Sequence, residues 1–175
     1  MTIKMDKELV CKAVTKAAAD EKVGNFCVKD GSVRIVEYDE ITPEMQKEKD
    51  RNGKLKYNYG STLCFCFKVS KLLEICQDVG QLNQMYHKHL KKVAMWMEEQ
   101  QKSEIPEKEN AWKFELFIQN CMGYFKQDKF GLLVVDREDE FAPVKNAPGA
   151  AVDSPDTARQ LLTDLHLKWF SLAGG

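Results

Sequence analysis

The stretch from Arg137 to Ala147 has the residue types of a ligand-binding loop. It reads Arg-Glu-Asp-Glu-Phe-Ala-Pro-Val-Lys-Asn-Ala and follows an apolar run at residues 130–135. Three successive acids repel one another, and Pro143 has no backbone N–H and a fixed φ, so we expect neither a helix nor a strand here. Lys145 is then a cation on a stiff loop directly after a buried strand, where α/β proteins usually place ligand-contacting groups. A solvated acidic turn is the alternative that the same residues allow.

Three further residues could contact a ligand because each lies at the end of a predicted element. Gly24 precedes a strand, where a missing side chain would let a ligand approach the backbone. Glu37 ends one predicted strand and Ser61 begins another. Sites on open α/β sheets gather at such ends. Each residue also has a purely structural interpretation, as a turn glycine, an exposed strand acid and a strand start.

Motifs for other kinds of chemistry are missing from the sequence. It contains no Walker-type loop, no Gly-x-Gly-x-x-Gly after a strand and no nucleophile elbow. His87 and His89 are expected on a helix, where residues two apart do not face each other. The carboxylates at 138–140 would point apart on an extended loop, whereas hard cations need convergent oxygens. We therefore predict no metal site within the chain.

The charge balance and the cysteine spacing argue against several classes of partner. The 175 residues carry 26 basic and 27 acidic side chains, a net charge of −1, which gives no electrostatic reason to expect nucleic acid or an anionic membrane. No apolar run approaches the roughly 20 residues that span a bilayer, and residues 1–8 lack the apolar core of a signal peptide. Of the six cysteines only Cys64 and Cys66 are close together, so we expect reduced structural thiols and a cytoplasmic protein.

Alternating strand and helix patterns predict an α/β fold. A hairpin with an Asp-Gly turn at residues 30–31 is expected to join strands at 25–28 and 33–38. A strand at 62–67 should be covered on both faces, and another is expected at 130–135. Residues 7–19 fit a helix or a strand. Three helices are predicted from caps: one after Thr42 that ends at Asn52-Gly53, one after Ser70, and one after Ser154 that ends at Gly174-Gly175. Two further helices are predicted at residues 82–101 and 112–125.

Read together, several segments resemble the eukaryotic UDP-N-acetylhexosamine pyrophosphorylases. Those enzymes make UDP-N-acetylglucosamine from UTP and the sugar 1-phosphate. The resemblance rests on motifs in family order at residues 21–24 (Glu-Lys-Val-Gly), 36–41 (Val-Glu-Tyr-Asp-Glu-Ile), 52–60, 137–147 and 157–175. It implies part of a Rossmann-like nucleotidyltransferase fold, with a mixed sheet flanked by helices. Residues 1–175 would be the sugar-binding half of the catalytic domain, incomplete at both ends, with the N-terminal nucleotide-binding half missing.

The resemblance also implies roles for particular residues. Lys145 would meet the phosphate of the sugar nucleotide as the catalytic cation. Ser61 stands where the family has an asparagine that reads the amino sugar. The sugar pocket would be formed by Gly24, Glu37, Tyr38 and Ser61, together with Phe114 and Leu116 as an apolar pair. The complete enzyme would need Mg²⁺, whose ligands, like the loop that cradles the UTP phosphates, would lie outside this chain.

Three hypotheses about function stay open. The chain could be a piece of a uridylyltransferase whose substrates are UTP and an N-acetylhexosamine 1-phosphate and whose product is UDP-N-acetylhexosamine; it would then be inactive alone. It could be a non-catalytic truncated paralogue that binds sugar nucleotide or pairs with a full-length relative, which Ser61 favours. It could also be a scaffold that uses an amphipathic helix at residues 82–101.

Overall fold

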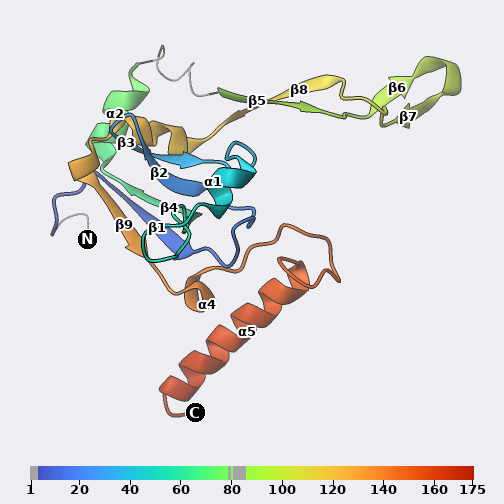
Figure 1. The fold of residues 1–175 in the computed structure, drawn as a ribbon. Helices are drawn as coiled ribbons and strands as arrows, with labels where there is room; N and C mark the ends of the chain where they lie inside the picture. The colour runs from blue at the N-terminus through green and yellow to red at the C-terminus, as the bar shows by residue number, and fades with distance from the viewer. Residues whose placement is uncertain (1–3, 79, 81–85) are drawn as a thin grey trace.

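A five-stranded mixed sheet forms the body of the protein in the computed structural model, which describes residues 4–78, 80 and 86–175 (Figure 1). The strand order is β3-β2-β4-β1-β9. Strand β1 runs parallel to β9 and antiparallel to β4, and β2 pairs antiparallel with both β3 and β4. The expected α/β class with a mixed sheet is thus confirmed. The strands are β1 (Leu9–Thr15), β2 (Asn25–Lys29), β3 (Ser32–Val36), β4 (Tyr59–Phe67) and β9 (Phe130–Val134).

The hydrophobic core lies on one face of this sheet. Helix α2 (Val69–Cys76) and the 3₁₀ helix η2 (Ile118–Tyr124) cover that face. Alternate residues of β1 point into it, as the two-residue period of a strand requires. The buried cluster consists of Leu9, Cys11 and Ala13 of β1 with Phe26, Val33, Ile75, Cys121, Met122 and Phe125. Residues 7–19, which fitted either type of element, therefore contain strand β1, which lies between β4 and β9, and the start of the loop after it.

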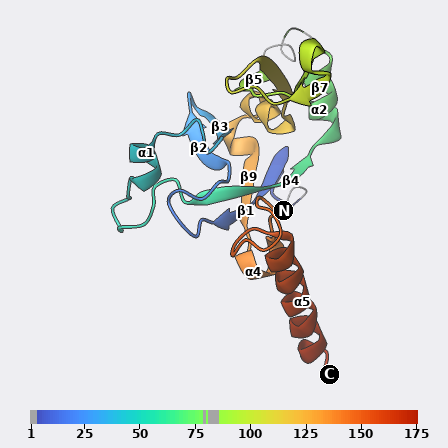
Figure 2. The same cartoon turned by 90° about the vertical axis from the view of Figure 1, so that its right-hand side faces the viewer.

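A thin two-stranded arm projects from the body (Figure 1) and is seen nearly end-on in Figure 2. It consists of β5 (Tyr86–Lys91) paired with β8 (Ala111–Leu116), then β6 (Met95–Met97) paired with β7 (Lys102–Glu104) around the 3₁₀ turn η1 (Glu98–Gln100). The helix predicted over 82–101 is therefore wrong for residues 86–101, and residues 82–85 lie outside the described part. The helix predicted over 112–125 is wrong for residues 112–116, whereas residues 118–124 are helical, as η2. Apolar residues recur at every second position of β8, and cross-strand pairing selects that period over the helical one.

Local signals predicted the hairpin and two helix starts correctly, but misjudged other boundaries. Asp30 and Gly31 have φ of 52° and 73° in the turn between β2 and β3, and the side chain of Thr42 caps α1 (Pro43–Lys47). Helix α1 ends before Asn52-Gly53, and α2 begins at Val69 without a side-chain cap, so Ser70 is no N-cap. The strand at 62–67 is not covered on both faces, because Leu63 is 61% exposed and Cys64 and Cys66 are exposed as well.

The acidic stretch at 137–140 forms one turn of helix, α4 (Arg137–Glu140), where we expected none. The side chain of Asp136 accepts a hydrogen bond from the Glu138 backbone N–H, and acids at a helix N-terminus interact favourably with its dipole. Two of the acids are also paired, Asp139 with Lys168 and Glu140 with Lys12. Capping and ion pairing thus offset the repulsion that argued against a helix. A second short turn, η3 (Gln127–Lys129), precedes β9.

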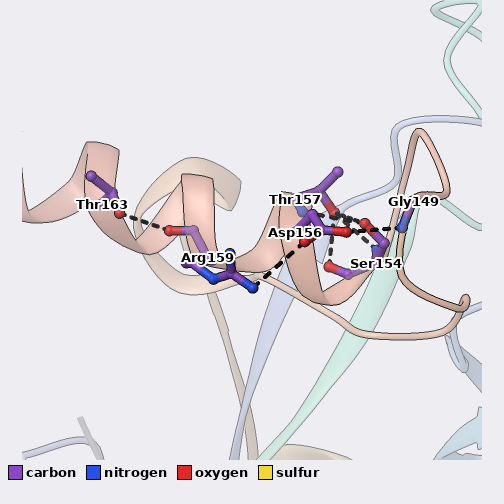
Figure 3. Close-up of polar contacts among 6 residues, drawn as sticks. All are labelled: Gly149, Ser154, Asp156, Thr157, Arg159 and Thr163. Carbon is purple, nitrogen blue, oxygen red and sulfur yellow. Dashed lines mark hydrogen bonds and ion pairs between the residues drawn. The ribbon is translucent and has the colours of Figure 1, made fainter.

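Helix α5 (Pro155–Leu172) extends away from the sheet (Figures 1 and 2), and none of its residues is buried. A reciprocal capping box opens it: the Thr157 backbone N–H donates to Ser154 Oγ over 3.2 Å, and Ser154 N–H donates to Thr157 Oγ1 over 2.9 Å (Figure 3). Gly174, at φ 91°, follows its end, as predicted. No helix in the described part of the chain is long and apolar enough to cross a membrane.

We predict that Ser154→Ala loosens α5 without loosening the sheet. The cap is worth about 1 kcal/mol, and α5 has no buried side chain through which its loss would reach the core. Hydrogen exchange should speed up at the amides of residues 156–159 and stay unchanged in β1. Thr163→Ala is the matched control, because Thr163 bonds only the Arg159 carbonyl in mid-helix, at 2.9 Å (Figure 3). Equally accelerated hydrogen exchange in β1 would show that α5 is coupled to the sheet and would contradict this prediction.

We also predict a sharp contrast in thiol reactivity. Burial raises the pKa of Cys11 to about 12, and its side chain is fully shielded in strand β1, whereas Cys64 and Cys76 are exposed. Because the thiolate is the reactive form, alkylation of the native protein should modify Cys64 and Cys76 and spare Cys11 until the protein unfolds. Peptide mass spectrometry measures this. Rapid native labelling of Cys11 would contradict the burial of β1 in the core.

Candidate functional site

A cavity of about 370 Å³ opens where the ends of several elements converge. It lies among the loop before β2, the segment after β3, the start of β4, the segment after β8 and the loop after α4. Five of the seven residues predicted from the sequence line it: Gly24, Glu37, Tyr38, Ser61 and Lys145. Residues separated by more than a hundred positions thus meet at one site, as expected for element ends of an α/β sheet.

The glycine at position 24 is required by close packing. The Ser61 backbone N–H donates to the Gly24 carbonyl over 2.8 Å. A Cβ atom on Gly24 would stand 2.5 Å from Ile35 Cγ2 and 3.4 Å from Glu37 Oε1. The Glu37 carboxylate therefore lies directly beside the Gly24 backbone, with no room for a side chain between them.

A buried lysine holds the loop that carries Gly24. Lys16 Nζ donates to the Ala19 carbonyl (2.8 Å) and to Asn25 Oδ1 (2.9 Å), and Asn25 Nδ2 donates to the Val23 carbonyl (3.0 Å). Lys16 and Asn25 are 7% and 1% exposed, and burial lowers the pKa of Lys16. One of these hydrogen bonds from Lys16 is made within the loop and the other to the first residue of β2, so we assign this lysine to structure rather than to ligand binding.

Ser61 sits beside an irregularity in β4. Its hydroxyl oxygen accepts a hydrogen bond from the Leu63 backbone N–H over 3.1 Å, and Leu63 has a left-handed φ of 58°. The pairing of β1 with β4 shifts register at the same place, between Cys11 and Ala13. Bulges of this kind often lie next to binding sites because they redirect side chains. The Ser61 hydroxyl keeps its proton and can still donate to a ligand.

The cavity is lined not by the predicted residues Phe114 and Leu116 but by two residues that follow them. Phe117 and Gln119 line the cavity, and Gln119 Nε2 donates to Glu37 Oε1 over 3.1 Å. Phe114 and Leu116 are not among the lining residues and are 63% and 51% exposed on β8. Phe117 shares a second cavity with Lys113 and Glu115, so the face of the arm that carries Phe114 and Leu116 is the opposite one. The two-residue strand period was the signal that could have identified Phe117.

The loop that carries Lys145 is fastened by its backbone. The N–H groups of Lys145 and Asn146 both donate to the Asp153 carbonyl, at 2.7 and 2.9 Å, and Asn146 Nδ2 donates to the Val152 carbonyl at 2.9 Å. The Lys145 side chain is exposed, and none of the ion pairs among the described residues includes it. Its ammonium group is thus available to an anionic ligand at the cavity.

An ion pair joins the two sides of the site. The Arg137 guanidinium binds the Glu21 carboxylate and also donates to the Thr15 carbonyl over 3.3 Å. Glu21 Oε2 in turn accepts from the Ala17 backbone N–H over 2.7 Å. Arg137 also lies 5.0 Å from the ring centroid of Phe141, which lines the cavity. Helix α4 is therefore tied to the loop that carries Gly24.

The residues lining the cavity do not suit a divalent metal ion. Within the described residues there is no group of three or more histidine, cysteine or acidic side chains that could hold one. Glu37 supplies the carboxylate of the cavity lining, whereas hard cations take several oxygens. His87 and His89 lie on strand β5, not on a helix, and share a face of it. His87 contacts Glu40 (3.3 Å) and Asn120 (3.2 Å), and His89 lies 4.0 Å from Glu115.

Comparison with known proteins gives consistent matches over most of the chain. The family model described as UTP–glucose-1-phosphate uridylyltransferase matches residues 1–154. UDP-N-acetylglucosamine pyrophosphorylase of Saccharomyces cerevisiae is 36% identical over 98% of this chain and 36% of its own length. Human UDP-N-acetylhexosamine pyrophosphorylase-like protein 1 is 37% identical over 93% of this chain and 31% of its own.

A solved structure agrees with these sequence matches. The crystal structure of uridine diphosphate N-acetylglucosamine pyrophosphorylase from Trypanosoma brucei, in complex with an inhibitor, superposes with a TM-score of 0.78 at 29% identity, over 97% of this chain and 32% of that one. The chain spans about a third of the length of the curated relatives that it matches. From the family match over residues 1–154 and these identities, the chain belongs to the UTP–glucose-1-phosphate uridylyltransferase family.

Proposed function

We propose that this chain is the sugar-binding half of a uridylyltransferase that converts UTP and N-acetylglucosamine 1-phosphate to UDP-N-acetylglucosamine and diphosphate. The observation that carries the proposal is the cavity. It combines a carboxylate held against a glycine backbone with a lysine on a fastened loop that forms no ion pair within the part of the chain that the structure describes. The relatives named UDP-N-acetylglucosamine pyrophosphorylase supply the substrate class.

The cavity offers complementary groups for a sugar phosphate. The Glu37 carboxylate accepts hydrogen bonds from sugar hydroxyls, and Phe117 and Tyr38 supply apolar surface for the ring. Lys145 binds the phosphate of the sugar 1-phosphate and offsets its charge. In the reaction an oxygen of this phosphate attacks the α-phosphorus of UTP, and the bond to the departing diphosphate breaks. Lys145 stabilises the negative charge on the transferring group.

The groups that hold UTP belong, in this proposal, to the remainder of a longer protein. The described lining contains no triphosphate cradle, and it does not fit the Mg²⁺ that transfer of a nucleotidyl group from a nucleoside triphosphate generally requires. Residues 1–175 therefore act as a sugar-binding half of the catalytic domain that does not turn over alone. Cytoplasmic localisation is part of the proposal and is supported by the six cysteines, none of which forms a disulfide in the described part of the chain.

A second candidate is a non-catalytic paralogue that binds sugar nucleotide or pairs with a full-length relative. Ser61 favours it, because its hydroxyl is engaged with the Leu63 N–H and is shorter than an amide that would read the acetamido group. Turnover on addition of a nucleotide-binding half would support the first candidate, and binding without turnover would support the second.

We predict that Lys145→Ala weakens binding of N-acetylglucosamine 1-phosphate by at least tenfold, because a cation that faces the phosphate is removed. The loop should keep its shape, since the backbone bonds of Lys145 and Asn146 to Asp153 do not involve the lysine side chain. Isothermal titration calorimetry measures the affinity. Lys126→Ala, at an exposed position outside the cavity lining, is the matched control. Unchanged binding by the Lys145 variant would reject the assigned role.

We predict that Gly24→Ala impairs both stability and sugar binding. The added methyl group would stand 2.5 Å from Ile35 Cγ2, so the strand or the Ile35 side chain has to shift. Overpacking of this kind costs about 1–3 kcal/mol of unfolding free energy. Urea unfolding and the same calorimetric titration test this. Wild-type stability together with wild-type affinity would show that the backbone at Gly24 is not a wall of the site.

A further inference from the structure

A buried glutamine lies directly behind the carboxylate of the site. Gln119 is 8% exposed, and its amide Nε2 donates to Glu37 Oε1 over 3.1 Å. It belongs to η2, whose Cys121 and Met122 are part of the hydrophobic core. The amide donor is therefore held by the best-packed part of the molecule rather than by a surface loop.

The Glu37 carboxylate is constrained on a second side by Gly24. A Cβ atom placed on Gly24 would stand 3.4 Å from Glu37 Oε1 and 3.5 Å from Oε2. Glu37 also borders a second cavity that contains His89, Lys91 and Lys113, but no ion pair found among the described residues joins any of them to it. Gln119 is thus the side chain that fixes the orientation of this carboxylate.

We propose that Gln119 is a positioning residue that gives the site its preference for hydroxyl-bearing sugars. A carboxylate has about four acceptor sites. The Gln119 amide occupies one of them on Oε1 and leaves Oε2 to accept from hydroxyl groups of the ligand. A ligand that lacks those hydroxyls leaves the carboxylate without partners, and such a loss lowers affinity strongly. This inference rests on the proposed function, because it assumes that the cavity binds a sugar phosphate.

A double-mutant cycle tests the positioning role. Gln119→Met keeps the side-chain volume and removes the amide, so we expect N-acetylglucosamine 1-phosphate to bind about tenfold more weakly. In a Glu37→Ala background the same substitution should cause no further loss, because its target is already absent. A full tenfold loss in that background would mean that Gln119 acts through packing, and would overturn the proposal. Gln160→Met, at an exposed glutamine of α5, is the matched control.

A pH series separates positioning from packing in a second way. Gln119→Glu places a carboxyl group beside Glu37, and two neighbouring carboxylates repel unless they share a proton. Relative to wild type at the same pH, this variant should bind poorly at pH 7.5 and recover most of its affinity at pH 5. A deficit that does not change with pH would contradict the role of the amide.

The pairing can also be measured without a ligand. In the wild-type chain the Gln119 side-chain NH₂ resonances should be shifted from those of free amides and exchange slowly, and Glu37→Ala should abolish both features. Failure of the wild-type chain to bind the sugar phosphate would reject the proposed function, and with it the sugar-reading role of Gln119. Resonances that do not respond to Glu37→Ala would instead reject the pairing itself.

Discussion

The geometry of the site depends on how the chain leaves strand β1. After β1 the backbone turns through residues 16–24 before it enters β2, and this loop positions Gly24. Two interactions hold the loop: the buried bonds from Lys16 to Ala19 and Asn25, and the ion pair between Glu21 and Arg137. The ion pair reaches across to α4. This one contact therefore helps to fix the distance between Gly24 and the loop that carries Lys145.

The lysines near the site divide into two physical roles. Lys16 is buried, its pKa is lowered by desolvation, and its ammonium group binds oxygens of its own loop. A buried cation with such partners stabilises one conformation, since removing the partners would leave an uncompensated charge. Lys145 is exposed, and only the backbone of its loop is held. The first lysine shapes the cavity, and the second is free to meet a ligand.

Sequence reasoning succeeded where a few adjacent residues determine the structure. The Asp30-Gly31 turn, the Thr42 cap and the Ser154 cap depend on local geometry, and each is as predicted. The helix predicted at 112–125 failed at residues 112–116 because β8 is set by pairing with β5, a partner some twenty to thirty residues away that periodicity alone does not reveal. The assignment of Phe114 and Leu116 to the sugar pocket came from the family resemblance and stays a prediction, whereas Phe117 lines the cavity.

The charges around the cavity explain why binding and catalysis separate in the proposed function. The lining contains Glu37 and two lysines, Lys22 and Lys145. One or two cations can bind a single phosphate. A triphosphate under nucleophilic attack carries more negative charge, and enzymes that use nucleoside triphosphates offset it with metal ions and a backbone cradle as well. The carboxylate side is more complete, since Glu37 is fixed from behind by Gln119 and from the side by Gly24. In the proposed function, a carboxylate held in one orientation and an incomplete set of phosphate-binding groups favour binding of the sugar over transfer of the uridylyl group. This is the division of roles expected of one half of a uridylyltransferase site.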